Sequence, residues 1–262
     1  MKDSIVGLTI QGNNVFVDHS HTDWLLTRPE ENPATEKSGS LIIYSVFKRK
    51  KLSNKQKHNK QQRHIGDNCP ILYALKGKEA LTTNISSIKK LKRSFDSISD
   101  KIKEKEPDGF DMVIPMPSSY NISYITGKRF ASCFNTMYYP GFLRKISVSQ
   151  AINILRDTIL VHNDKKRLQF LLQLQQKENG KNAKFSLKGI PARFRYIFSP
   201  VEISPSSDNS RISPGRILLV DDLLATGTTL LSATRVVQCL FSSAEIRAAC
   251  LFSSLSGNLD PG

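Results

Sequence analysis

The segment Ile217–Thr229, which reads ILLVDDLLATGTT, constrains the fold more than any other part of this chain. Its four leading apolar residues predict a strand that is buried on both faces, as in a parallel sheet. Two adjacent carboxylates, Asp221 and Asp222, end that strand, and a loop of small residues leads into a predicted helix. In open α/β sheets ligands bind at the carboxyl ends of the strands, so this segment predicts a binding site.

The loop between the acid pair and the helix is suited to hold a phosphate group. A helix N-terminus offers free N–H groups and the positive end of the helix dipole, and threonine adds hydroxyls. Two carboxylates beside such a loop would repel a bare phosphate, so they are best explained as ligands of ribose hydroxyls or of a metal ion. The predicted phosphate-binding residues are Ala225, Thr226, Gly227, Thr228 and Thr229.

This segment resembles the phosphoribosyl-pyrophosphate (PRPP) signature of type I phosphoribosyltransferases at every position. The resemblance implies that Asp221 and Asp222, the catalytic candidates, contact the ribose hydroxyls, that residues 225–229 hold the 5′-phosphate, and that Mg²⁺ accompanies the substrate. The same two acids are the candidates for an indirect contact with that Mg²⁺. Some purine-salvage members carry a general-base Asp at the position of Ala225, so that role is missing here or supplied elsewhere.

A second segment, Asp111–Ser118 (DMVIPMPS), resembles the strand and pyrophosphate loop of ComF-like phosphoribosyltransferases. Its two prolines fix the loop shape, and its backbone N–H groups can face an anion. The resemblance implies a pyrophosphate loop made of Pro115, Met116, Pro117 and Ser118. Residues 71–76 and 165–185 resemble further parts of these proteins more loosely, and Lys165, Lys166 and Arg167 are candidates to close over the pyrophosphate.

Positive charge is concentrated in the middle of the chain. The net charge is +15, and residues 48–105 hold 17 basic and 5 acidic residues, which contribute +12 of it. A block of this density indicates a polyanion as partner, such as nucleic acid or a nucleoprotein. The nucleic-acid candidates are Lys48, Arg49, Lys50, Lys51, Lys89, Lys90, Lys92 and Arg93. An ordinary solvated helix face is the alternative explanation for the lysines of residues 85–102.

The remaining pattern predicts alternating strands and helices. Residues 4–17 predict a hairpin around Gly-Asn-Asn, and the apolar spacing from Ile85 to Ile102 predicts an amphipathic helix capped by Thr83 or Asn84. Loops are expected at 27–40 and 199–215. Further strands are expected at 41–47, 110–114, 195–198, 216–220 and 245–251, and further helices at 127–138, 147–160, 165–177 and 228–241.

These elements predict an α/β fold, a type I phosphoribosyltransferase core with a mostly parallel twisted sheet and helices on both faces. A small β-rich basic extension would precede it. The expected parts are residues 1–47 (β-rich extension), 48–105 (basic arm and amphipathic helix) and 106–262 (phosphoribosyltransferase-like domain). Residues 48–64 and 202–213 contain few large apolar residues and are expected to be poorly ordered.

Two classes of function stay open. The first is a phosphoribosyltransferase that binds PRPP or a nucleotide ribose-phosphate with Mg²⁺ and transfers phosphoribose to a base-like acceptor. The second is a nucleic-acid-associated effector or regulator with altered or no transferase activity, since ComF-like proteins are linked to DNA uptake and similar domains serve in retron-type antiphage defence. No apolar run reaches the ~18 residues of a spanning helix, and no signal-peptide pattern begins the chain, so a cytoplasmic protein without membrane contact is expected.

Overall fold

The computed structural model describes residues 7–18, 24–50, 65–180, 183–206 and 213–255. Its main sheet has seven strands in the order β3-β5-β12-β11-β7-β8, with β4 paired to β5. The strands β5, β12, β11, β7 and β8 are parallel, whereas β3 and β4 run antiparallel to β5. This confirms a mixed α/β fold with a mostly parallel sheet. The strand bounds are β3 Leu25–Leu26, β4 Ala34–Ser38, β5 Leu41–Arg49, β7 Met112–Pro115, β8 Met137–Tyr138, β11 Arg216–Leu223 and β12 Glu245–Phe252.

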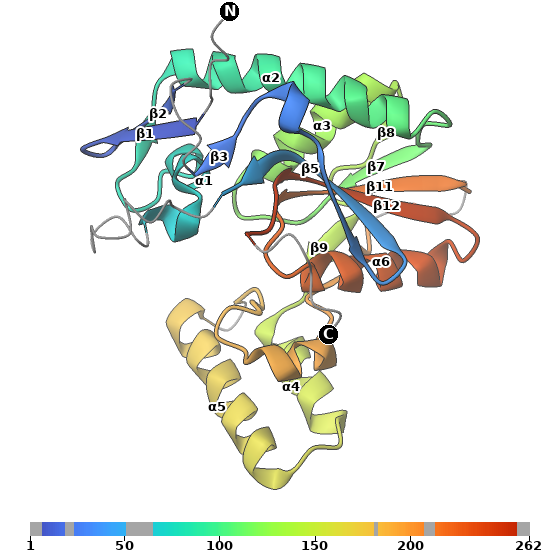
Figure 1. Cartoon of the computed structure of the whole chain (residues 1–262). Helices are drawn as coiled ribbons and strands as arrows, with labels where there is room; N and C mark the ends of the chain where they lie inside the picture. Colours follow the sequence, from blue (N-terminus) through green and yellow to red (C-terminus); the bar gives the residue numbers. More distant parts are fainter. Residues whose placement is uncertain (1–6, 19–23, 51–64, 181–182, 207–212, 256–262) are drawn as a thin grey trace, which may run out of the picture.

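Helices cover both faces of this sheet (Figure 1). Helices α2 (Ile85–Lys105) and α3 (Ile122–Phe134) lie on one face, and α6 (Thr228–Leu240) lies on the other. Alternate residues of β11 supply the two cores: Leu218 and Val220 pack with the α2–α3 side, and Ile217 and Leu219 with the α6 side. All four are fully buried, as a strand covered on both faces requires.

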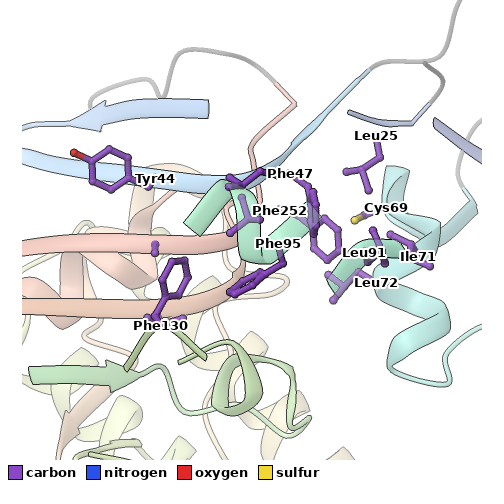
Figure 2. Packing of buried hydrophobic residues seen from close by; sticks show 14 of the residues in the cluster. Leu25, Tyr44, Phe47, Cys69, Ile71, Leu72, Leu91, Phe95, Phe130 and Phe252 are labelled. Atoms are coloured by element: carbon purple, nitrogen blue, oxygen red, sulfur yellow. The ribbon is translucent and has the colours of Figure 1, made fainter. Parts of the chain in front are cut away.

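The core under α2 joins the first half of the chain to its last strand (Figure 2). The ring of Phe47 on β5 lies 5.9 Å from that of Phe252 on β12, and the rings of Phe95 and Phe130 lie 5.3 Å apart. Helix α1 (Pro70–Leu75) adds buried Ile71 and Leu72 to the same core. The three-part division of the chain stays a prediction, and its first boundary, at residue 47, falls inside β5.

The N-terminal hairpin is confirmed, with β1 (Gly7–Gln11) antiparallel to β2 (Asn14–Asp18). The short strand β6 (Thr82–Thr83) extends it into a three-stranded sheet. The amphipathic helix is also confirmed: Asn84 caps α2 by accepting a hydrogen bond from the N–H of Ser87 at 2.8 Å. However, only the later apolar residues of α2 are buried, because Ile85 is 72% exposed and Ile88 is 44% exposed.

A separate helical unit, here called the hood, lies beside the α6 side of the sheet and has its own apolar core (Figure 1). It contains α4 (Val148–Asp157), α5 (His162–Asn179) and the 3-10 helix η3 (Ala192–Ile197). A two-stranded antiparallel sheet, β9 (Leu143–Lys145) with β10 (Val201–Ile203), connects it to the rest of the molecule. Two further 3-10 helices are η1 (Pro29–Glu31) and η2 (Ile65–Asn68).

Several expected elements are wrong in type or bounds. The expected loop 27–40 contains β4, whose polar residues pair with β5 along a hairpin. The helix expected at 127–138 is α3, which ends at Phe134 because Asn135 adopts a left-handed conformation (φ 51°), and Met137–Tyr138 form β8. The strand expected at 195–198 falls in η3 and the start of the loop after it, and strand β10 lies within the expected loop 199–215. Most of the segment 48–64, together with 207–212, lies outside the described residues.

At the amino ends of the strands, Glu106 fixes the end of α2 to the sheet. This residue is 4% exposed, and its carboxylate accepts a hydrogen bond from the Tyr44 hydroxyl at 2.6 Å. The guanidinium of Arg216 pairs with it at 2.5 Å, and that of Arg247 lies 3.4 Å from it. Burial, followed by the hydrogen bond to Glu106, raises the pKa of Tyr44. The carboxylate therefore links α2, β5, β11 and β12.

Among the residues that the structure describes, no helix is both long enough and apolar enough to cross a membrane.

Candidate functional site

The two aspartates lie at the carboxyl end of β11, which runs three residues further than expected and includes both. Asp222 is 8% exposed, and the ammonium nitrogen of Lys76 lies 2.5 Å from its Oδ2. The Oδ1 of Asp221 accepts hydrogen bonds from the N–H of Asp222 at 2.8 Å and from the hydroxyl of Ser123 at 3.3 Å. Each carboxylate thus has a partner from a different helix region, α1 or α3.

The acid pair is electrostatically unfavourable without further positive charge. Burial, and next the charge of Asp222, raises the pKa of Asp221 to about 7. Burial lowers the pKa of Lys145, and attraction to Asp221 partly opposes that shift. A ligand that brings hydroxyl donors or a cation to Asp221 would therefore be stabilised at this place.

The predicted phosphate loop leads into the N-terminus of α6. Gly227 is the N-cap residue with φ 74°, a left-handed conformation that favours glycine, and it has no side chain to cap the helix. The first N–H groups of α6 have no partner inside the helix, and no N-cap side chain accepts a hydrogen bond from them. The hydroxyls of Thr226 and Thr228 lie 3.0 Å apart at the same end. This arrangement can accept an anion.

The expected pyrophosphate loop is only partly free to act as one. Pro115 belongs to β7 and pairs with Val220, and the N–H of Met116 donates to the Val220 carbonyl at 2.7 Å. Proline has no N–H, so Pro117 offers none either. Within the described residues, Ser118 is the loop member whose N–H makes no hydrogen bond. Met116 therefore has no free N–H for an anion, and the two prolines have none to offer, so Ser118 is the member of this loop best placed to bind one; the assignment of the loop to pyrophosphate stays a prediction.

A cavity of about 380 Å³, here called the aspartate cavity, contains the acid pair and part of both predicted loops. Residues from the sheet, from the α1 end and from the hood form its walls. They include Lys76, Lys78, Pro117, Ser118, Tyr120, Lys145, Phe185, Leu187, Lys188, Val201, Asp221, Asp222 and Thr229. Of the predicted site residues, the structure brings together Asp221, Asp222, Met116, Pro117, Ser118 and Thr229. Pro115, Ala225, Thr226, Gly227 and Thr228 are not among the residues that line this cavity.

A second cavity of about 520 Å³ shares Pro117, Ser118, Ser119 and Lys145 with the first. Arg144, Lys184 and Glu202 line it. The Glu202 carboxylate is held by the Nε of Arg144 at 2.7 Å and by the amide of Gln150 at 3.0 Å. Lys165, Lys166 and Arg167 are not among the residues that line either cavity.

Sequence reasoning missed four lysines of the aspartate cavity: Lys76, Lys78, Lys145 and Lys188. Lys76 had a weak signal, since it ends the segment 71–76 that resembles ComF-like proteins. The others carry no local signal, because each comes from a different part of the chain and only the fold brings them together. Within the described residues, no group of three or more His, Cys, Asp or Glu side chains could hold a metal ion by itself.

The nucleic-acid candidates are not equivalent in the structure. Arg49 is 7% exposed, and its Nε donates to the Ser253 carbonyl at 2.6 Å, so it is not presented on the surface. The ammonium of Lys90 donates to the Val17 carbonyl at 3.1 Å, and that of Lys92 pairs with Asp96 at 2.6 Å. Lys48, Lys50, Lys89 and Arg93 are exposed, and Lys51 lies outside the described residues.

Comparison with known proteins adds little to this geometry. No family model and no curated protein matches the chain. Among solved structures, adenine phosphoribosyltransferase from Saccharomyces cerevisiae, complexed with a dideoxy-imino-altritol bisphosphate and adenine, is similar with 17% sequence identity and a TM-score of 0.35. The similarity covers 66% of this chain and 73% of that chain. At this TM-score the likeness carries no argument.

Proposed function

We propose that this chain is a phosphoribosyltransferase-like protein that binds PRPP, or the ribose-phosphate part of a nucleotide, in the aspartate cavity. One observation carries the proposal: Asp221 and Asp222 share that cavity with Thr229, at the N-terminus of α6, and with Ser118. Carboxylates accept hydrogen bonds from ribose hydroxyls, and a helix N-terminus binds phosphate. A sugar phosphate can place its hydroxyls at the two carboxylates and its phosphate at the N-terminus of α6.

The proposed reaction is transfer of phosphoribose to a base-like acceptor. The bond between C1 of the ribose and pyrophosphate breaks, and the electron pair leaves with pyrophosphate. A bond from C1 to a nitrogen of the acceptor forms, and the proton of that nitrogen passes to solvent water. Lys76, Lys78 and Lys145 are suited to neutralise the leaving pyrophosphate, and the acid pair to orient the ribose. Among the apolar residues of the hood that line the same cavity, Leu187 is only half-buried and offers an apolar contact for a flat acceptor.

A magnesium ion is compatible with this cavity when it comes with the substrate. Mg²⁺ is usually held by one or two carboxylates together with substrate phosphates, and Asp221 and Asp222 supply that number of carboxylates. Bound there, the ion would neutralise charge on the pyrophosphate. The ammonium of Lys76 already occupies one oxygen of Asp222. This arrangement fits a Mg²⁺ ion that enters together with the substrate better than one that is bound permanently.

The proposal is tested by titrating the wild-type chain with PRPP by calorimetry, with and without Mg²⁺, and by supplying PRPP with free bases. Saturable binding that strengthens with Mg²⁺ is expected, and formation of a nucleotide would identify the acceptor. Absence of PRPP binding in both conditions would contradict the proposal.

We also retain the nucleic-acid-associated effector as a second candidate, because Lys89 and Arg93 are exposed one helical turn apart on α2. Their neighbours Ile85 and Ile88 are exposed as well, so the described residues leave this end of α2 as an open surface with positive charge. Such a surface can contact the phosphates of a nucleic acid. DNA uptake and antiphage defence are settings in which this second function would apply.

For this second candidate, nucleic-acid affinity is expected to fall with salt, with a log–log slope of roughly −3 to −5 if about five phosphates are contacted. Changing Lys89 and Arg93 to Glu should make the slope shallower by about 2. Fluorescence anisotropy with labelled single- and double-stranded DNA measures it. The matched control changes two exposed lysines on other elements, K37E with K177E, and should leave the slope nearer to wild type. A slope near zero for the wild-type chain would rule out this candidate.

A further inference from the structure

We propose that the turn Lys76–Ala80, here called the lysine turn, binds the pyrophosphate end of the ligand, and that Lys76 leaves Asp222 to do so. The inference rests on the proposed function and adds to it a specificity element from outside the segment 106–262. The turn follows α1, whereas both motifs that point to PRPP lie much later in the chain.

The backbone of the lysine turn is held in an uncommon conformation. Gly77, Glu79 and Ala80 have φ values of 61°, 53° and 55°, in the left-handed region that residues with a Cβ rarely adopt. Hydrogen bonds maintain this shape: the N–H of Lys78 donates to the Tyr73 carbonyl at 2.9 Å, and the Glu79 carboxylate accepts from the N–H of Gly66 at 2.9 Å. Such strained turns are concentrated at functional sites.

Both lysines of the turn face the loop that follows β7. The ammonium groups of Lys76 and Lys78 lie 5.4 Å and 4.8 Å from the ring centre of Tyr120. The N–H of Tyr120 in turn donates to the hydroxyl of Ser118 at 3.2 Å. The two ammonium groups therefore gather beside the part of that loop where Ser118 keeps an uncommitted N–H, and a phosphate placed there would meet both lysines.

The ion pair between Lys76 and Asp222 is one that a bound ligand can replace. The Asp222 oxygen that Lys76 occupies is one that a ribose hydroxyl or Mg²⁺ would need, so ligand binding displaces the ammonium. With Lys145 and Lys188, the aspartate cavity holds four lysines against two aspartates. This excess of positive charge fits a ligand with more negative charge than a single phosphate, as PRPP has and ribose 5-phosphate has not.

The test compares PRPP with ribose 5-phosphate, both with Mg²⁺, by calorimetry on the full chain. Lys78 is exposed, so K78M should fold normally, and loss of one charge-assisted contact should reduce PRPP affinity about 10-fold or more. Affinity for ribose 5-phosphate should stay near wild type. K76M should also weaken PRPP, but should leave ribose 5-phosphate unchanged or bound more tightly, because Asp222 loses its competitor. K76R keeps the positive charge and should bind PRPP more tightly than K76M does. K37M on β4 is the control for loss of a distant lysine and should bind both ligands as the wild type does.

The outcomes separate the two proposals. A wild-type chain that binds neither ligand would overturn the proposed function, and the inference with it. A wild-type chain that binds PRPP, with K78M and K76M losing affinity for both ligands equally or for neither, would overturn the inference alone.

Discussion

Changing both Asp221 and Asp222 to Asn is expected to reduce PRPP affinity by at least about 100-fold, because each lost charge-assisted hydrogen bond is worth about 1.5–3 kcal/mol. Asn keeps the size of Asp but removes its charge and replaces one acceptor oxygen with an NH2 donor. The two carboxylates lie adjacent at the end of a buried strand, so neutralising them should not destabilise β11. Calorimetry in the presence of Mg²⁺ measures the loss.

The control is D157N, an exposed aspartate at the end of α4, which should bind PRPP as the wild type does. Thermal unfolding of each variant shows whether the fold is retained. Equal affinity of the wild type and the double variant would mean that the acid pair does not contact the ligand.

Glu106→Ala is expected to lower the free energy of unfolding by about 3–5 kcal/mol, because it leaves buried charges without their partner. Arg216 and Arg247 are each 18% exposed at the side chain and both approach this carboxylate. Tyr44 would lose the acceptor of its hydroxyl. Glu245, which also pairs with both arginines, is more exposed and compensates only in part. Urea denaturation followed by circular dichroism measures the change.

A matched control is E104A, an exposed glutamate two residues earlier on the same helix, which should cost less than about 1 kcal/mol. If E106A were no more destabilising than E104A, the linkage between α2 and the sheet would be packing alone.

Much of the fold could be predicted because apolar patterning is local. The run Ile217–Val220 and the segment 245–251 read directly as buried strands, and the spacing of Leu91, Phe95, Ile98 and Ile102 gives the buried face of α2. The short polar strand β4 was missed because it is stabilised by pairing with β5 rather than by its own apolar residues. Ile85 and Ile88 fit the helical period, but the described chain does not cover the first turn of α2.

The acid pair and the phosphate loop of the candidate site could be predicted from the sequence, whereas the lysines of the aspartate cavity could not. The acid pair and the phosphate loop are contiguous, so their spacing carries the information. The lysines come from three separate places, the lysine turn (Lys76 and Lys78), β9 (Lys145) and the hood (Lys188), and they meet only when these parts pack around the end of β11. The same limit applies to Arg49, which lies in a strongly basic run but is buried against Ser253 by the pairing of β5 with β12.

The strand order has a consequence for the way this protein emerges from a ribosome. The last strand, β12, lies between β5, from the first fifth of the chain, and β11. Until residues 245–252 have been synthesised, β5 has no parallel neighbour and the ring of Phe47 lacks its contact with Phe252. Contacts between such distant segments slow folding, and exposed strand edges favour aggregation. A nascent chain stalled before β12 is therefore expected to need chaperones, and a nonsense mutation near the end should be as damaging as one near the start.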